Sequence, residues 1–352
     1  MKKAIALAVS LFLMVAIVAA CGSNNKNDAG NTAGNSAATN NAAGETKEKQ
    51  KIALVLPEKI GVNKFFVLMD EGFKKAGAEF GAEVKTIEST DPAGFEQNLR
   101  ATVAEDYDLI ITATFQAEDA LKKVAAENPD KPFAIIDTVV DLPNVRSVVF
   151  REHEAAYLMG ALAGLATKTN IVGAVVAMDA PLLKKYTSGF EQGLKSTNPN
   201  AQFLVNYVGS FTDPVKGKEL ALLQHSKGAD YIAGMAAVGD NGVFEAAKEK
   251  GFYASGQDTD RNEEDPEHIV LSQLKGTDAV AYETVKAFVE GTFEYEAADY
   301  GLKEDGVGLT YVTRESKAPL NAFIGQENVD KVKAIAEDIK SGKIVVENPL
   351  AQ

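Results

Sequence analysis

The sequence predicts an α/β protein with two doubly wound lobes, and three observations lead to this prediction. Short β-branched runs alternate with helical stretches from Lys51 onward, which calls for parallel strands with helices on both faces. The alternation restarts near residue 145, so two lobes of similar size fit better than one oversized sheet. With 352 residues, 45% hydrophobic and 24% charged, the chain can bury two such cores.

The first lobe is predicted to contain four strands and three helices. The strand-like runs are IALVLP, AEVKTIE, YDLIITATF and PFAIID. The helical stretches between them cover residues 63–80, 95–104 and 118–126. In the first helix, apolar side chains recur at steps of three and four and mark the face that packs on the sheet: Phe66, Met69, Phe73, Ala76 and Phe80.

The second lobe repeats the pattern. Its strand-like runs are VRSVVF, NIVGAVVAMD, QFLVNYVGSF, ADYIAGMA, FYASGQD and HIVLSQL, with helical stretches at 152–166, 182–196, 215–225 and 243–250. A helix at 276–291, a strand near 306–312 and a helix at 326–341 are shared between the lobes. The predicted lobes are residues 50–147 plus about 274–306, and residues 148–273 plus about 307–352.

The N-terminal segment has the layout of a secretory signal. Residues 1–20 combine a basic start, an apolar stretch and a small-residue end that runs into Cys21. Residues 18–21, VAAC, resemble a lipobox, whose cysteine receives a diacylglycerol and becomes the new N-terminus; the alternative is an ordinary signal with an accidental cysteine. Residues 21–49 are too polar to bury a core and form a tether. We expect a lipid anchor on the extracytoplasmic face of the cell membrane.

Composition and motifs exclude several function classes. Lys and Arg total 36 against 50 Asp and Glu, so the basic footprint of a nucleic-acid binder is missing. Cys21 is the only cysteine, and His153, His225 and His268 lack metal-ligand spacing, so no metal site is expected. No nucleophile elbow, phosphate-binding loop or dinucleotide fingerprint occurs, so we expect neither catalysis nor a cofactor. A binding module is the first interpretation.

Ligands of doubly wound folds bind outside the carboxyl ends of the strands, and several candidate residues lie there. Phe65 follows the first strand and lies off the core face of its helix, while Phe211 ends a strand of the second lobe. These two rings could hold a flat ring between them. Carboxylates also end strands, although a single strand-end Asp is often only a helix cap or turn residue: Asp137, Asp179 and Asp258.

Residues from about 50 to 315 resemble the basic membrane protein family of ABC-transporter substrate-binding lipoproteins, of the purine-nucleoside-receptor type. The supporting stretches, weak singly and strong in this order, are REHEAAYLMGALAG, GAVVAMDAPLLKKYTSGFEQGLKSTNP, YVGSFTDPVKGKELA, VGDNGVFEAAKEKG, GQDTDRN and GLKEDGVGL. The resemblance implies a type I periplasmic-binding fold with a ligand cleft between its lobes. It also implies an ABC permease as partner and a purine nucleoside as ligand.

The resemblance further implies roles for individual residues. Phe65 and Phe211 would stack the base, while Asp258 and Lys275, in LSQLKGTD, would hold the ribose hydroxyls. A further polar contact to the base is expected from the first lobe, and Asp119 in FQAEDA is preferred to Asp137. Because the chain has no arginine cluster near these residues, it should prefer a neutral nucleoside to an anionic nucleotide.

One departure from the family pattern keeps other functions open. Where the family has D-x-S-F-N before its first helix, this chain has V-N-K-F-F, so Val62 and Phe66 replace two polar residues. The leading interpretation is a solute-binding lipoprotein that delivers a nucleoside to a permease by hinge closure. The alternative is a regulatory lipoprotein of the same fold with a relaxed or lost ligand site. A nucleoside- or sugar-processing enzyme is the third.

Overall fold

The computed structural model describes residues 49–351. The predicted signal segment, Cys21 and the tether up to residue 48 lie outside the described residues. No helix within this part of the chain is long and apolar enough to cross a membrane.

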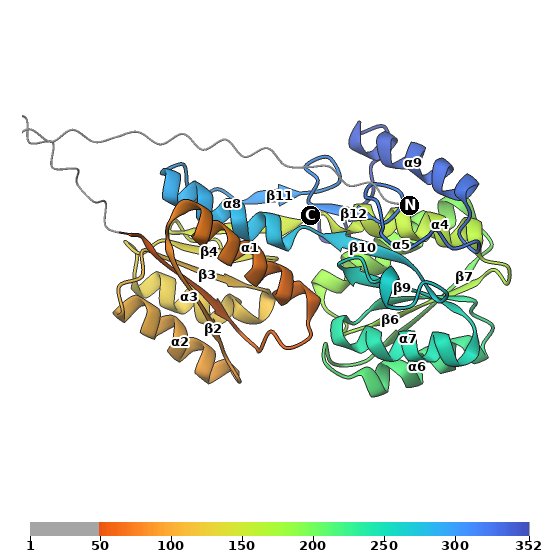
Figure 1. Cartoon of the computed structure of the whole chain (residues 1–352), viewed down its shortest axis with the longest axis horizontal. Coiled ribbons are helices and arrows are strands. Elements are labelled where there is room, and N and C mark those ends of the chain that lie inside the picture. The colour runs from red at the N-terminus through yellow and green to blue at the C-terminus, as the bar shows by residue number, and fades with distance from the viewer. Residues whose placement is uncertain (1–48, 352) are drawn as a thin grey trace, which may run out of the picture. The chain divides into compact units, whose positions relative to one another are not determined.

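The first lobe is a six-stranded parallel sheet with helices on both faces (Figure 1). The strand order is β11-β5-β4-β3-β1-β2. The strands are β1 (Lys51–Leu56), β2 (Glu83–Glu88), β3 (Leu109–Ala113), β4 (Phe133–Ile136), β5 (Val145–Phe150) and β11 (Ala298–Tyr300). The helices are α1 (Lys64–Phe80), α2 (Pro92–Ala104), α3 (Glu118–Glu127) and α8 (Thr277–Glu290).

Strand β1 shows why helices cover both faces of this sheet. Its side chains alternate between two cores: Ile52 and Leu54 pack in the layer of α1 and α8, and Ala53 and Val55 pack in the layer of α2 and α3. A strand buried on both faces reads as a continuous apolar run, which is what IALVLP shows. The predicted core face of α1, which begins at Phe66, is buried in the first of these layers.

The second lobe repeats the design with one reversed edge strand. Its order is β12-β10-β9-β8-β6-β7, with only β12 antiparallel to its neighbour. The strands are β6 (Ile171–Val176), β7 (Gln202–Tyr207), β8 (Tyr231–Met235), β9 (Tyr253–Asp258), β10 (Ile269–Lys275) and β12 (Val307–Leu309). The helices are α4 (Glu152–Ala166), α5 (Pro181–Thr197), α6 (Pro214–Ser226), α7 (Asp240–Lys250) and α9 (Gln326–Lys340). These elements confirm the predicted α/β fold of two doubly wound lobes.

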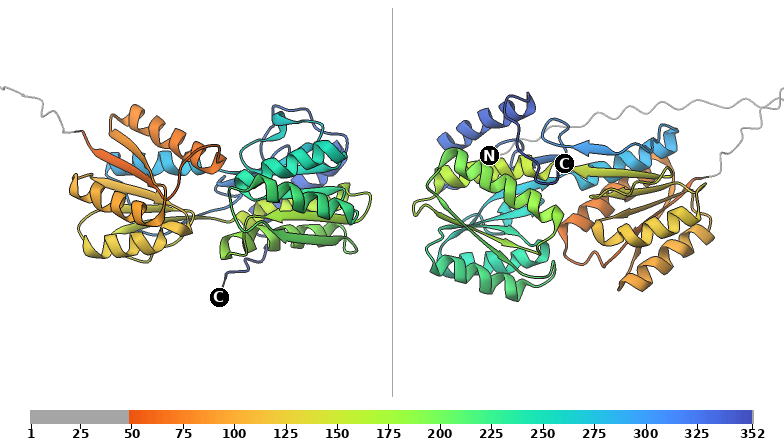
Figure 2. Two further views of the ribbon diagram at one scale, coloured as in Figure 1. Left: turned by 90° about the horizontal axis from the view of Figure 1, so that it is seen from below. Right: turned by 180° about the vertical axis from the view of Figure 1, so that it is seen from behind.

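The chain passes between the two sheets three times, after β5, after β10 and after β11 (Figure 2). The predicted lobe boundary at residue 147/148 falls within β5, and all of β5 belongs to the first sheet. We therefore place the first crossing between Phe150 and Glu152. The boundary predicted at about 274 likewise falls at the end of β10, which belongs to the second sheet.

Helices α4 and α5 cross at unusually close range and form the rigid base of the second lobe. A Cβ atom at Gly193 would lie 1.9 Å from the carbonyl oxygen of Tyr157, and one at Gly189 would lie 2.3 Å from that of His153. Only glycine permits this approach of the two backbones. Near this crossing, Glu152 in the first turn of α4 pairs with Lys185 of α5.

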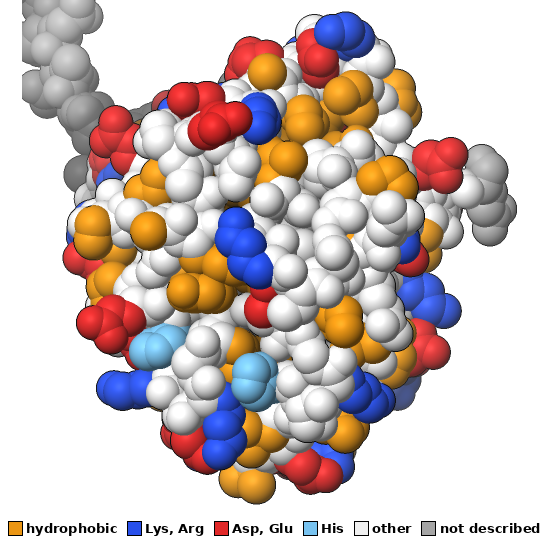
Figure 3. All heavy atoms as spheres, turned by 90° about the vertical axis from the view of Figure 1, so that its right-hand side faces the viewer, with side chains coloured by type: hydrophobic (Ala, Val, Ile, Leu, Met, Phe, Trp, Pro, Cys, Tyr) orange, Lys and Arg blue, Asp and Glu red, His pale blue; other side chains and the backbone are white. Residues whose placement is uncertain are grey.

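The surface carries both signs of charge. On the side of the second lobe seen in Figure 3, acidic and basic side chains are interspersed among apolar ones. This side of the described chain therefore has no continuous basic surface that could bind a polyanionic partner.

Candidate functional site

A cavity lies between the carboxyl ends of the two sheets, where ligands of this fold class bind. It encloses about 590 Å³ of space between atoms, its open mouth included. Four of the five side chains predicted to contact ligand line it: Phe65, Phe211, Asp258 and Lys275.

The cavity has aromatic walls. Phe65 lies in the first turn of α1, whose N-cap residue Asn63 accepts a hydrogen bond from the Phe65 amide at 3.2 Å. This cap fixes the start of the helix and so the place of the ring. From the second lobe, Phe211 lies in the loop before α6, and its ring centroid is 6.2 Å from that of Phe115. Phe115 also lines the cavity and provides a third ring.

Three polar residues at strand ends have left-handed backbone. Thr114 follows β3 with φ 72°, Asp137 follows β4 with φ 79°, and Asp258 ends β9 with φ 69°. Non-glycine residues rarely adopt this conformation, and its cost of about 1–3 kcal/mol is tolerated mainly at functional sites. All three side chains line the cavity.

A buried charge cluster lies at the back of the cavity and consists of Asp137, Glu152, Lys185 and Lys275. The Lys275 ammonium pairs with Asp137 and, at 2.9 Å, with Glu152. Lys185 on α5 pairs with Glu152 and donates to the carbonyl oxygen of Phe150 at 2.8 Å. Two cations and two anions balance, as burial requires. Asp137 belongs to the first lobe and the other three residues to the second, so the cluster joins the lobes.

Burial and pairing set the pKa values in this cluster. Burial raises the pKa of Glu152, but Lys275 and Lys185 outweigh it and lower the value to about 2. Burial raises the pKa of Asp137 to about 7 against the opposing effect of Lys275. Burial works against the charge of Lys275, yet Asp137 and Glu152 hold its pKa well above the ordinary value. Lys275 is therefore a permanent hydrogen-bond donor at the cavity wall.

The fifth predicted contact, Asp119, does not line this cavity. It is exposed on α3 and borders an adjoining hollow together with Glu118 and Leu350. Of the two aspartates weighed for the first lobe, Asp137 is the one on the cavity wall, where burial by both lobes explains its altered pKa.

The two residues that depart from the family pattern are placed differently. Phe66 is 1% exposed and lines the cavity with its edge against Phe65, at 5.2 Å between ring centroids. Val62 is 65% exposed and borders a smaller hollow beside Asp258. The sequence did not indicate several further cavity residues, among them the polar Thr114 and Gln257. Their positions at strand ends are the only signal that could have indicated them.

No group of three His, Cys, Asp or Glu side chains is placed to hold a metal ion anywhere in residues 49–351. The polar groups of the cavity are instead suited to hydrogen-bonding an organic solute between aromatic rings.

Two doubly wound lobes with a cavity between their strand ends are the architecture of solute-binding proteins of ABC transporters, which regulators share. A solved structure of an ABC-transporter solute-binding protein from Aeropyrum pernix matches this chain with a TM-score of 0.76 and 26% identity, over 86% of this chain and 94% of that one. The family model described as "ABC transporter substrate-binding protein PnrA-like" matches residues 49–348. The chain belongs to this family, the basic membrane protein family, as its sequence indicated.

Two curated relatives support the same assignment. The "CD4+ T-cell-stimulating antigen" of Listeria monocytogenes is 33% identical over 263 residues, which cover 68% of this chain and 74% of the relative. The "ABC transporter nucleoside-binding protein BmpA" of Lactococcus lactis is 28% identical over 372 residues, which cover 98% of this chain and 99% of the relative. The similarity to the second protein extends over nearly the whole of both chains.

Proposed function

We propose that this protein binds a purine nucleoside between its lobes and delivers it to an ABC permease. The observation that carries the proposal is the convergence of Phe65, Phe211, Asp258 and Lys275 on one cavity from both lobes. The name of the Lactococcus lactis relative, a nucleoside-binding protein, supports the same ligand class.

Each proposed role follows from the chemistry of the side chain. Phe65 and Phe211 stack the base, and a stacked base contributes about 1–3 kcal/mol. Asp258 accepts hydrogen bonds from ribose hydroxyls, each worth about 1.5–3 kcal/mol to a charged acceptor. Lys275 donates to the same ribose while Asp137 and Glu152 hold its ammonium in place.

Charge favours a neutral ligand. Lys275 and Lys185 are already paired with buried carboxylates, and Asp258 adds a further acid to the wall. A nucleotide phosphate would need basic partners or a cradle of backbone amides. A nucleoside needs neither, so we expect nucleosides to bind more tightly than nucleotides.

The three connections between the lobes support delivery by hinge closure. Residues of both lobes wall the cavity, so a ligand that contacts both stabilises the closed form. The permease then recognises the closed, loaded protein, which a lipid on Cys21 keeps at the membrane surface.

Removal of the Asp258 carboxylate, the proposed partner of the ribose hydroxyls, tests the proposal. Asp258→Ala should weaken adenosine binding about 10- to 150-fold in calorimetric titration, because a charged hydrogen bond worth about 1.5–3 kcal/mol is lost. Asp179→Ala is the matched control, since Asp179 is an exposed aspartate that also follows a strand but lines neither the cavity nor the hollow beside Asp258. An unchanged dissociation constant for Asp258→Ala would remove this residue from the site. If the parent neither binds nor releases on denaturation any nucleoside, the assignment fails.

A regulatory role without transport is the second candidate, and the apolar residues Val62 and Phe66 favour it. A protein that has lost its ligand would show no nucleoside binding in the same titration. Calorimetry of the parent therefore separates the two candidates.

A further inference from the structure

Two buried acceptor atoms without hydrogen-bond partners lie beside Asp258. Within the part of the chain that the structure describes, neither Oε1 of Gln257 nor Oδ2 of Asp240 has a partner. Gln257 is 5% exposed and Asp240 is fully buried. Both line a small hollow together with Asp258, and Gln257 also lines the main cavity. The hollow therefore adjoins the cavity, and the two share Gln257 and Asp258, the proposed partner of the ribose hydroxyls.

The end of β8 holds both side chains in place. Nε2 of Gln257 donates to the carbonyl oxygen of Gly234 at 2.7 Å. Oδ1 of Asp240 accepts from the amide of Ala236 at 2.8 Å. Each side chain thus has one polar atom committed to the backbone and one oxygen left over. Leaving a buried acceptor unpaired costs free energy. A ligand group that supplies the missing hydrogen bonds would therefore bind more tightly.

We propose that Gln257 and Asp240 form a subsite for the 5′-hydroxyl of the bound nucleoside. This inference rests on the proposed function, in which Asp258 and Lys275 account for two of the three ribose hydroxyls. The remaining hydroxyl needs a partner, and the two residues that carry unpaired oxygens line the hollow together with Asp258.

A hydroxyl suits the chemistry of these two side chains. It donates to an amide oxygen such as Oε1 of Gln257 and can both donate and accept. Burial raises the pKa of Asp240 to about 7, so this carboxyl can be charged or neutral near neutral pH. A hydroxyl can hydrogen-bond to either form.

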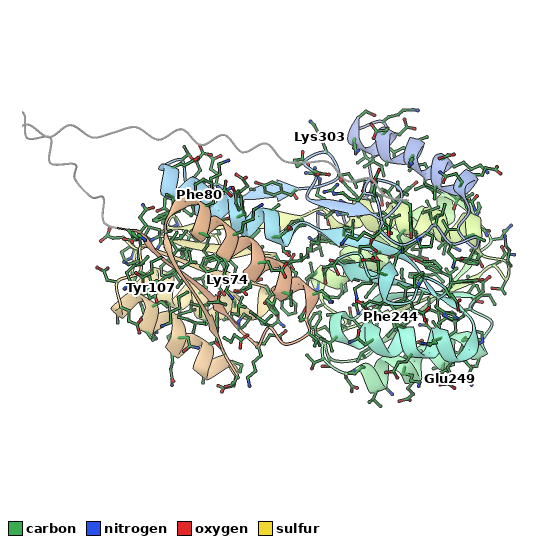
Figure 4. The ribbon with its side chains drawn as sticks, viewed as in Figure 1. Lys74, Phe80, Tyr107, Phe244, Glu249 and Lys303 are labelled. Atoms are coloured by element: carbon green, nitrogen blue, oxygen red, sulfur yellow. The ribbon has the colours of Figure 1, made fainter. Side chains whose placement is uncertain are left out.

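A phosphate in the same position would meet two cations and two acids, because Lys64 and Arg261 border the hollow together with Asp240 and Asp258. Arg261 borders the hollow, but its guanidinium donates to Glu264 and, at 2.7 Å, to Asn241. It also lies 4.8 Å from the centre of the ring of Phe244, which Figure 4 labels on α7. The charge of Arg261 is therefore already compensated, and the carboxyl groups of Asp240 and Asp258 would face the phosphate.

The test pairs a variant with a ligand that lacks the proposed partner. Calorimetry would compare the parent and Gln257→Met with adenosine, 2′-deoxyadenosine and 5′-deoxyadenosine. We expect Gln257→Met to bind adenosine and 2′-deoxyadenosine about 3- to 10-fold more weakly than the parent, as for loss of one neutral hydrogen bond. Its affinity for 5′-deoxyadenosine should equal that of the parent, because that ligand has no 5′-hydroxyl to lose.

The matched control is Gln224→Met. Gln224 is also fully buried, donates to a backbone carbonyl, that of Ala174 at 2.8 Å, and has an unpaired Oε1, but it lines neither the cavity nor the hollow. Gln224→Met should leave all three affinities unchanged. If Gln257→Met does not fold, Asp240→Ala replaces it, because alanine can neither donate to nor accept from the 5′-hydroxyl; weaker adenosine binding and unchanged 5′-deoxyadenosine binding are expected.

Two outcomes would overturn the subsite while the proposed function stands. One is parent-like adenosine binding by Gln257→Met. The other is an equal loss of affinity for adenosine and 5′-deoxyadenosine, which would show a merely structural role. If the parent binds no adenosine at all, the proposed function and the subsite fall together.

Discussion

At the residue scale, the cavity shows which site residues a single sequence can indicate. Phe65, Phe211 and Asp258 could be assigned to the cavity because each follows or ends a strand and because the carboxyl ends of parallel strands meet at one edge. Lys275 came from the family resemblance. Asp119 lies on the first turn of α3, and the sequence does not fix how far that turn is rotated away from the cavity.

The polar residues that sequence analysis missed depend on backbone geometry. Thr114 lines the cavity with φ 72°, a conformation that threonine rarely adopts and that no local motif indicates. Gln257 matters because its amide nitrogen is bound by Gly234 of a neighbouring strand. Both features arise from contacts between segments far apart in the sequence, so they become visible only in the folded chain.

The altered entry to α1 leads to a prediction about base selectivity. Because Val62 and Phe66 cannot hydrogen-bond to a base, we expect adenosine, guanosine and inosine to bind with similar affinities. The Val62→Asp, Phe66→Asn double variant should bind purine nucleosides more tightly. The gain would be about 0.5–1.5 kcal/mol for the neutral hydrogen bond of Phe66→Asn and about 1.5–3 kcal/mol for the charged one of Val62→Asp, measured by calorimetry.

Stability decides whether that double variant is informative. Phe66 is 1% exposed, and truncating a buried phenylalanine costs about 3–5 kcal/mol. The variant must first be shown to unfold cooperatively above the titration temperature. Val215→Asp, at a valine 79% exposed on α6, controls for an added surface acid. Failure of a folded double variant to bind any nucleoside more tightly would show that these positions do not read the base.

At the element scale, periodicity predicted most helices and strands to within a few residues. Helix α1 was expected at 63–80 and spans Lys64–Phe80, and α8 was expected at 276–291 and spans Thr277–Glu290. The sequence does not indicate to which of the two sheets β5 belongs. Its sequence VRSVVF resembles the start of a new lobe, and only its pairing with β4 places it in the first sheet.

The crossing of α4 and α5 gives a prediction about glycine. Gly193→Ala would bring a Cβ atom to 1.9 Å from the carbonyl oxygen of Tyr157, so the two helices would have to separate. We expect the free energy of unfolding to fall by about 1–3 kcal/mol, as for other overpacked cores, measured by urea denaturation. Gly94→Ala in α2 is the control, because its Cβ would meet nothing closer than 3.6 Å. That change should stabilise the protein slightly, and equal effects of the two substitutions would contradict a tight crossing.

At the scale of the whole molecule, the proposed lipid on Cys21 would hold the two lobes at the membrane surface. Cys21→Ala should prevent lipidation, so that a cleaved protein is released from the membrane, because the two acyl chains that make a stable anchor are absent. Fractionation of cells expressing the parent and the variant measures this. Continued membrane retention of a correctly cleaved Cys21→Ala protein would count against the lipid anchor.

The buried charge cluster joins the lobes and makes the stability of the whole molecule depend on pH. The pKa of Glu152 is about 2, since Lys275 and Lys185 outweigh the effect of burial. A carboxyl whose folded-state pKa lies below its unfolded value of 4.5 adds stability above pH 4.5, and this stability is lost as the pH falls toward 2. The raised pKa of Asp137 acts in the opposite sense between about pH 4 and pH 7, so the contribution of Glu152 must be isolated by a variant.

Glu152→Gln leaves two buried ammonium groups with one carboxylate and should lower the free energy of unfolding at pH 7 by about 3–5 kcal/mol. The difference between parent and variant should shrink as the pH falls from about 4.5 toward 2, because Glu152 of the parent becomes protonated over that range. Urea denaturation at a series of pH values measures both effects. Glu327→Gln is the control, since Glu327 is 84% exposed and its ion pair with Lys331 should contribute little. A stability difference that stays constant from pH 7 down to pH 2 would show that the charge of Glu152 does not stabilise the fold, because only its ionised form pairs with both lysines.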